Sequence, residues 1–124
     1  MVKLLMVGMG GFAGSICRYL VYEASALVLT NAWLPYGTLT VNILGCFIIG
    51  FLGGLSEARA LFSPEMRALV FVGFLGGFTT FSTFGLDIFT QLSQGRMAAA
   101  GVTIGLHLIL GLAAVWLGWH LGLR

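Results

Sequence analysis

Four long apolar stretches, separated by shorter segments with more polar residues, run through the whole sequence. They cover residues 4–29, 37–55, 66–92 and 97–122. A helix of about 20 apolar residues crosses the hydrocarbon core of a bilayer, and each stretch approaches or exceeds that length. The pattern therefore predicts one all-α membrane domain over residues 1–124, made of four transmembrane helices.

The connections between these stretches are short. Residues 31–36 form a turn that contains Pro35, and residues 93–96 form a tight turn. Residues 56–67 are the longest polar connection, which we expect to be solvated and to carry no chemistry. Within it, Ser63-Pro64-Glu65 predicts a helix start, because proline and an acidic residue are favoured in the first helical turn.

The third stretch departs from a plain apolar pattern near its middle, where residues 72–84 read VGFLGGFTTFSTF. Gly73, Gly76 and Gly77 each disfavour a helix by about 1 kcal/mol relative to alanine. Four hydroxyl side chains follow, and they can bond backbone groups that a break releases: Thr79, Thr80, Ser82 and Thr83. We therefore predict that the third helix is broken near its middle.

Two aromatic side chains come directly after this predicted break. Phe81 and Phe84 are three residues apart, so they share one face if the helix resumes there. A broken helix at membrane depth is tolerated only where protein or a water-filled path surrounds it. The stretch therefore predicts an ion or solute pathway.

Three further polar residues lie within apolar stretches, and each allows two interpretations. Asn42, which shares a helix face with Thr38, would either form an interhelical hydrogen bond or line a pathway as a donor. Asp87 would be functional if it lies inside the membrane, or would sit near the water interface, because its helix ends soon afterwards. His107 would either pack with hydrogen bonds or belong to the pathway.

The composition favours a membrane protein. Only 8% of the residues are charged and the mean hydropathy is +1.04, whereas soluble domains carry about 25% charged residues. The net charge of +2 is small and scattered, which argues against nucleic acid as a partner. Cys17 and Cys46 both fall in apolar stretches, so we expect packed free thiols rather than a disulfide.

Two alternative interpretations of the N-terminal region are weak. A signal peptide would end in a small-residue cleavage site, but none is clear, and Arg18 and Glu23 interrupt the apolar run; we expect a retained helix. Residues 8–13 match a dinucleotide-binding GxGxxA pattern, but Glu23 comes too early for the acid that this motif requires. The chain is also too short and too apolar for that fold.

Pairs of glycines four residues apart predict close helix contacts: Gly10 and Gly14, Gly101 and Gly105, and Gly118 and Gly122. Four short helices do not easily enclose a pathway, so these faces also suggest an oligomer. Four spans place both termini on one side of the membrane. That side would hold four basic residues and the other two, a weak bias for orientation: Lys3, Arg59, Arg67 and Arg124 against Arg96 and Arg18.

No group of residues in the sequence supports an enzyme. There is no metal-ligand cluster, no Ser-His-Asp set and no phosphate-binding loop. The remaining hypotheses are a channel or transporter, and a small membrane-packing subunit of a larger complex. The predicted break favours the first, because a packing subunit has no need of it.

Two motifs closely resemble those of the Fluc (CrcB) family of fluoride channels: GGFTTFSTF at residues 76–84 and GTLTVN at residues 37–42. The glycine-rich first stretch with Arg18 also fits, and the resemblance extends over essentially the whole chain. It implies an antiparallel homodimer inserted in both orientations, with two fluoride pores between the subunits. It also implies passive export of fluoride across the bacterial inner membrane.

The same resemblance implies roles for individual residues. Phe81 and Phe84 would be the pore phenylalanines, Asn42 the pore carboxamide, and Thr38 the hydroxyl one turn before it. The backbone carbonyls of Gly76 and Thr79 would hold a structural Na⁺ ion on the dimer axis. The expected fluoride pathway then comprises Phe81, Phe84, Asn42, Thr38, Ser82, Thr83, Asp87, Arg18 and His107. Asp87 is one methylene shorter than the glutamate usual in relatives, and His107 stands where relatives often carry serine.

Overall fold

Four helical segments cross the molecule in the computed structural model, which describes residues 1–28, 33–59 and 61–124. All four are long and apolar enough to span a membrane, which confirms the predicted all-α membrane architecture. The first and second are α1 (Val2–Val28) and α2 (Tyr36–Arg59). The third is composite, and the fourth is α6 (Met97–Gly122).

The third segment consists of four consecutive pieces. A short helix, α3 (Pro64–Arg67), continues into a π-helical stretch, η1 (Ala68–Leu75), and then into α4 (Gly76–Phe78). Two residues in extended conformation separate α4 from α5 (Phe81–Ser93). The predicted break near the middle of the third helix is therefore confirmed.

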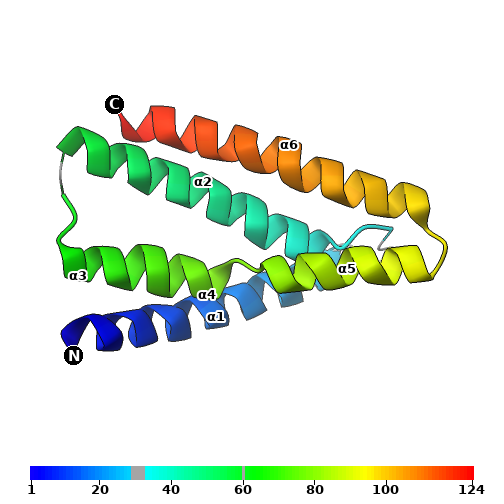
Figure 1. Ribbon diagram of the computed structural model, residues 1–124, viewed down its shortest axis with the longest axis horizontal. Coiled ribbons are helices and arrows are strands. Elements are labelled where there is room, and N and C mark those ends of the chain that lie inside the picture. Colours follow the sequence, from blue (N-terminus) through cyan, green and yellow to red (C-terminus); the bar gives the residue numbers. More distant parts are fainter. Residues whose placement is uncertain (29–32, 60) are drawn as a thin grey trace.

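The segments run back and forth along the long axis of the molecule, which is horizontal in Figure 1, so both termini lie at the same end. Helix α6 packs along α2, and α1 packs along η1 and α4. At the far end, α5 turns into α6 at Gly95, whose φ of +72° favours glycine. The four spans thus bring both termini to one end of the molecule, which is the arrangement that the predicted placement on one side of the membrane requires.

Glycines allow close contact within two pairs of helices, α6 with α2 and α1 with η1. A Cβ atom built on Gly118 would lie 2.3 Å from the carbonyl oxygen of Phe47, and one on Gly14 would lie 2.1 Å from that of Phe74. There is no space for a side chain at either glycine. The predicted close packing at the pairs Gly10–Gly14 and Gly118–Gly122 is therefore confirmed. The third pair differs: nothing lies within 4 Å of a Cβ on Gly101 or Gly105.

The prediction that glycines break the third helix is wrong. Gly73, Gly76 and Gly77 are all helical. A Cβ on Gly77 would lie 2.6 Å from the carbonyl oxygen of Gly11, and one on Gly73 would lie 2.7 Å from that of Val7. Two of the three glycines therefore serve contact with α1, because packing of a helix outweighs the small cost of glycine within it.

The polar connection after α2 is shorter than the predicted residues 56–67. Helix α2 continues to Arg59, because glutamate, alanine and arginine are good helix formers outside the membrane as well. The expected helix start is confirmed: the Ser63 side chain accepts a hydrogen bond from the Met66 amide at 3.2 Å. Arg67 then donates to Ser56 at 2.8 Å across the connection.

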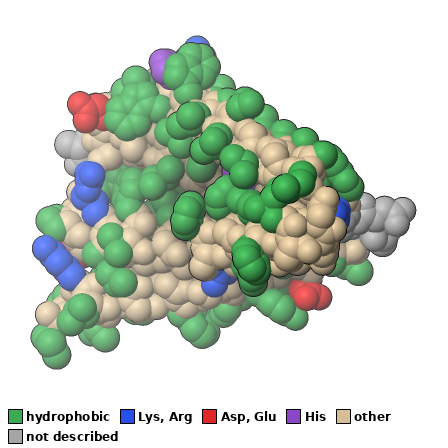
Figure 2. All heavy atoms as spheres, turned by 45° about the vertical axis from the view of Figure 1, so that its right-hand side comes forward, with side chains coloured by type: hydrophobic (Ala, Val, Ile, Leu, Met, Phe, Trp, Pro, Cys, Tyr) green, Lys and Arg blue, Asp and Glu red, His purple; other side chains and the backbone are tan. Residues whose placement is uncertain are grey.

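The interior is small, and much of the apolar surface faces outward. Val41, Thr38 and Thr103 are the largest side chains that are fully buried. Many large apolar side chains are exposed, and hydrophobic side chains are spread over the face seen in Figure 2, as expected of a surface solvated by lipid. Cys17 and Cys46 are both free thiols, as predicted.

Candidate functional site

Thr79 and Thr80 interrupt the third membrane segment. Both are extended, with φ and ψ of −85° and 161° at Thr79 and of −151° and 115° at Thr80. The Thr79 hydroxyl donates to the Leu75 carbonyl at 2.9 Å. The Thr80 hydroxyl oxygen accepts from the Thr83 amide at 3.2 Å and so begins α5 as its N-cap. Hydroxyls thus bond backbone groups at the break, as the sequence predicts.

Asn42 of α2 holds the backbone of Thr80 on both sides. The Thr80 amide donates to Asn42 Oδ1 at 2.9 Å, and Asn42 Nδ2 donates to the Thr80 carbonyl at 3.0 Å. Buried backbone groups without partners are costly, so this carboxamide stabilises the break. The interhelical hydrogen bond expected for Asn42 is present, and one of its two Nδ2 hydrogens remains for another acceptor.

These bonds release two backbone carbonyls. In an unbroken helix the Gly76 carbonyl would accept from the Thr80 amide, and the Thr79 carbonyl from the Thr83 amide. Both amides donate elsewhere, to Asn42 and to the Thr80 hydroxyl. Gly76 is exposed, and nothing lies within 4 Å of a Cβ built on it. The two carbonyls are hard oxygen donors of the kind that suits a small cation such as Na⁺.

Arg18 of α1 approaches the same break. Its Nη1 donates to the Thr79 carbonyl at a long 3.4 Å. Arg18 also lines a hollow of about 530 Å³ together with Glu23, Ser82 and Thr83. A positive side chain therefore stands beside the break, within reach of one of the released carbonyls.

The two phenylalanines after the break form a pair, as their spacing predicts. The ring centroids of Phe81 and Phe84 lie 5.6 Å apart. Phe81 is 82% exposed and borders a hollow of about 400 Å³ beside the break, which Asn42 also lines. Phe84 instead packs on the His107 ring of α6, with 4.4 Å between centroids.

His107 combines packing with an unused nitrogen. Its Nδ1 lies 2.8 Å from the Thr103 carbonyl, which can only accept, so Nδ1 carries a proton. Its Nε2 is buried without a partner among the described residues. The expected packing of His107 is present, and it brings the ring against one of the predicted pathway residues.

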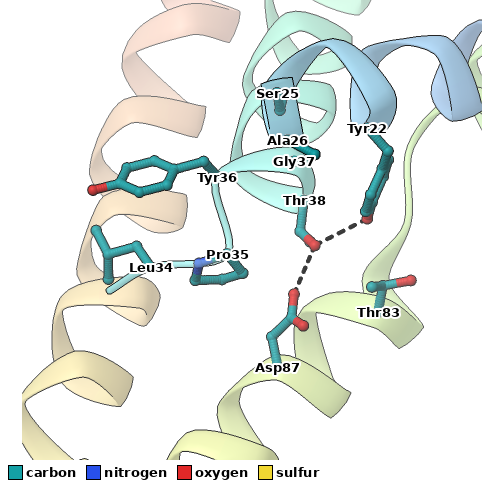
Figure 3. Close-up of a pocket in the computed structure, with 10 residues that line it drawn as sticks. All are labelled: Tyr22, Ser25, Ala26, Leu34, Pro35, Tyr36, Gly37, Thr38, Thr83 and Asp87. Carbon is teal, nitrogen blue, oxygen red and sulfur yellow. Dashed lines mark hydrogen bonds between the residues drawn. The ribbon is translucent and has the colours of Figure 1, made fainter. Parts of the chain in front are cut away.

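Asp87 and Thr38 meet between α5 and α2. The Thr38 hydroxyl donates to Asp87 Oδ2 at 2.6 Å, and its oxygen lies 2.9 Å from the Tyr22 hydroxyl (Figure 3). The three side chains line a hollow of about 440 Å³. Asp87 therefore reaches Thr38 despite its short side chain, and Thr38 donates its single hydroxyl hydrogen to the carboxylate.

The hydroxyls of Ser82 and Thr83 share one neighbour. Ser82 Oγ lies 3.2 Å and Thr83 Oγ1 lies 3.0 Å from the Thr80 hydroxyl. Because the Thr80 hydroxyl has one proton, it donates to at most one of them. The side chain that does not receive the Thr80 hydrogen either donates its own hydroxyl hydrogen to Thr80 or has it available for another acceptor.

Most of the residues predicted for the site lie around the break or along α5. Five of them border the break: Asn42, Arg18, Phe81, Ser82 and Thr83. The other four lie further along α5 and the helices beside it: Thr38, Asp87, Phe84 and His107. The sequence did not single out Tyr22. Its position four residues after Arg18 places it on the same helix face, and this spacing is the signal that marks it.

Fold and site together define a multi-pass helical membrane protein with an interrupted helix and polar side chains inside the membrane. The comparisons with known proteins agree with this class. The family model described as "CrcB-like protein, Camphor Resistance (CrcB)" matches residues 5–119. The chain therefore belongs to the CrcB family.

Curated relatives match over nearly the full length. A protein of Methylobacillus flagellatus is 42% identical over 124 residues, covering 98% of this chain and 94% of the relative. One of Rhizobium etli is 43% identical, covering 95% and 94%, and one of Maridesulfovibrio salexigens is 41% identical, covering 98% and 96%. Each is named "Fluoride-specific ion channel FluC". The family is one of channels rather than enzymes, as the sequence predicts.

Proposed function

We propose that this protein is a fluoride-selective channel that lets fluoride leave the cytoplasm down its gradient and so lowers the intracellular concentration. The observation that carries the proposal is the break at Thr79–Thr80, held open by Asn42 and followed by the Phe81–Phe84 pair. Its relatives' names support fluoride as the ion. The bacterial sources of those relatives support the inner membrane as its location.

Fluoride is small and strongly hydrated, so entry into a membrane requires donors that replace its water. The free Nδ2 hydrogen of Asn42 and the hydroxyls of Ser82 and Thr83 are the nearest donors to the break. Arg18 adds positive charge beside them. These groups would accept the ion in turn, and weak serial sites allow it both to enter and to leave.

The phenylalanines guide the anion without holding it tightly. A phenyl ring is positive at its edge and negative on its face. Phe81 and Phe84 lie one helical turn apart on α5, so their edges form consecutive contacts for an anion that moves along this helix. Beyond them, His107 packs on Phe84, while Asp87 accepts a hydrogen bond from the Thr38 hydroxyl.

We further propose that two copies form an antiparallel dimer in the membrane, with one pathway on each side of the contact. The break and Phe81 are open on one copy, and lipid does not satisfy exposed backbone carbonyls. A second copy would cover them. A two-fold axis in the membrane plane brings the two breaks together.

The released carbonyls of Gly76 and Thr79 fit a structural Na⁺ ion on that axis. Bound there by the carbonyls of both copies, Na⁺ would offset the repulsion between their negative ends. Arg18 is the side chain that competes for the Thr79 carbonyl, but its contact is long, at 3.4 Å. The ion would link the subunits and would not be transported.

A fluoride electrode tests the function directly. Liposomes that contain only this protein and are loaded with potassium fluoride should release fluoride when a potassium ionophore removes the electrical barrier, and chloride release should be far slower. Without fluoride release the channel proposal is wrong. The second candidate, a packing subunit of a larger complex, would then be favoured.

A further inference from the structure

We propose that Tyr22 is a positioning residue of the ion pathway: its hydroxyl donates to Thr38 and thereby keeps the Thr38 hydroxyl directed at Asp87 as a donor. This inference rests on the proposed fluoride channel. It concerns a side chain on α1 to which the motifs around the break assign no role.

The direction of the hydrogen bonds follows from the number of protons. A threonine hydroxyl has one hydrogen and two lone pairs. Thr38 donates its hydrogen to Asp87 Oδ2 at 2.6 Å. At the 2.9 Å contact between the Thr38 and Tyr22 hydroxyls, Tyr22 must therefore be the donor. The two hydrogen bonds, drawn as dashed lines in Figure 3, are therefore donated in one direction, from Tyr22 to Thr38 and from Thr38 to Asp87.

Tyr22 lines two hollows that differ in their charged groups, since one has a single carboxylate and the other has a basic and an acidic side chain. One, of about 440 Å³, is lined by Asp87, and the other, of about 530 Å³, is lined by Arg18 and Glu23. Tyr22 and Thr83 line both. An ion that moves from the Arg18 side along α5 therefore passes Tyr22 and Thr83 before it meets the carboxylate.

The two hydrogen bonds, from Tyr22 to Thr38 and from Thr38 to Asp87, control the direction of the Asp87 carboxylate. Thr83 lies one turn before Asp87 on α5, so a free carboxylate is able to turn toward the donor on Thr83 and repel an anion there. The bond from Thr38 holds Asp87 against α2 instead. Without the Tyr22 donor, we expect the Thr38 hydroxyl to be held less firmly and Asp87 to turn more freely toward Thr83.

The ring of Tyr22 is positioned independently of its hydroxyl. It lies against Gly37, where a Cβ atom would be 2.9 Å from Tyr22 Cδ1. Replacement by phenylalanine keeps this contact and removes only the donor. The variant Tyr22→Phe therefore tests the hydrogen bond and leaves the packing of α1 on α2 in place.

The experiment is fluoride efflux from liposomes with few channels each. The fraction of fluoride released reports how many liposomes hold a working protein, and the rate constant reports conduction. Tyr22→Phe should lower the rate constant about fivefold, the factor for one neutral hydrogen bond, with the released fraction unchanged. Tyr36→Phe is the control, because its hydroxyl points away from Thr38 and Asp87 in Figure 3.

A double-mutant cycle separates positioning from a direct role. In a Thr38→Val background, Tyr22→Phe should cause no further fall, whereas in Thr38→Ser, which keeps a hydroxyl, the fall should persist. A wild-type rate for Tyr22→Phe, a loss of released fraction alone, or additive effects with Thr38→Val would overturn the inference. Absence of fluoride release by the unaltered protein would instead refute the proposed function.

Discussion

Thr80 is the residue on which the candidate site depends, because its backbone amide and carbonyl form hydrogen bonds with a side chain of another helix in place of their usual partners within the third helix. Asn42 pairs with its amide and carbonyl, and its hydroxyl caps α5. The sequence marks Asn42 as an unusual amide in an apolar helix but not the atoms it would meet. Those atoms become available only when the third helix is already broken.

Replacement of Asn42 by Asp should lower fluoride flux by about tenfold or more, and a tenfold fall corresponds to a rise of ~1.4 kcal/mol in the barrier to conduction. The carboxylate still accepts from the Thr80 amide, but it loses the donor to the Thr80 carbonyl and adds negative charge beside the pathway. Efflux from liposomes measures the change. Gln94→Glu, the same exchange on an exposed side chain at the end of α5, should leave flux unchanged. Equal flux in wild type and a folded Asn42→Asp protein would leave Asn42 with a structural role alone.

The two phenylalanines should separate conduction from stability. Phe81→Ala and Phe84→Ala should each lower flux about tenfold or more, because each removes a ring edge from the pathway. Phe81 is 82% exposed within the subunit, so its loss should little affect the thermal stability of the subunit, whereas Phe84→Ala removes the contact with His107. Phe89→Ala on the same helix, at a side chain 69% exposed, is the control. If both variants conduct like wild type, the rings only pack.

At the scale of helices, the glycines have a different role from the one that propensity indicates. The sequence predicts that Gly73, Gly76 and Gly77 break the third helix, yet the helix continues through all of them. Propensity values describe an isolated helix. In the folded chain, contact with α1 decides the conformation, and the break falls instead where side chains replace the helical hydrogen bonds, at Thr79–Thr80.

Two alanine substitutions in α1 test this role. Gly14→Ala should destabilise the protein by about 1–3 kcal/mol, because the new Cβ would lie 2.1 Å from the Phe74 carbonyl oxygen. Gly8→Ala should be neutral or stabilising, since nothing lies within 4 Å of its Cβ and alanine favours a helix. Thermal unfolding in detergent compares the two. Equal stability of both variants would contradict close packing of α1 on η1.

At the scale of the whole molecule, the surface that one chain leaves open matches the proposed dimer. Phe81 is largely exposed, and Gly101 and Gly105 have no neighbour within the subunit that a side chain would meet. The weak bias of basic residues permits insertion in both directions. The exposed ring and the two open glycines are surfaces that a second copy would cover in the proposed dimer.

Labelling of one terminus in intact cells tests the orientation. A tag at the C-terminus, after Arg124, should be accessible from both sides of the membrane if the protein inserts both ways. Chemical crosslinking should capture a dimer whose thermal stability falls when sodium is replaced by a bulky organic cation. The same replacement should leave a monomeric membrane protein in the same detergent unchanged. A single orientation, or a dimer indifferent to sodium, would contradict the proposed assembly.

The pattern of apolar residues by itself determined the four spans, and the hydroxyl-rich stretch within the third span marked the place of the break to within a few residues. Local chemistry suffices for these, because a segment of about 20 apolar residues enters a bilayer whatever its neighbours. Tertiary structure alone decided which partners each polar group would find. The Thr38 hydroxyl donates a hydrogen bond to Asp87, Asn42 bonds Thr80, and Tyr22 joins the site from another helix. Hydrogen bonds act over about 3 Å, so only the packing of α1, α2 and α5 against one another brings these atoms together.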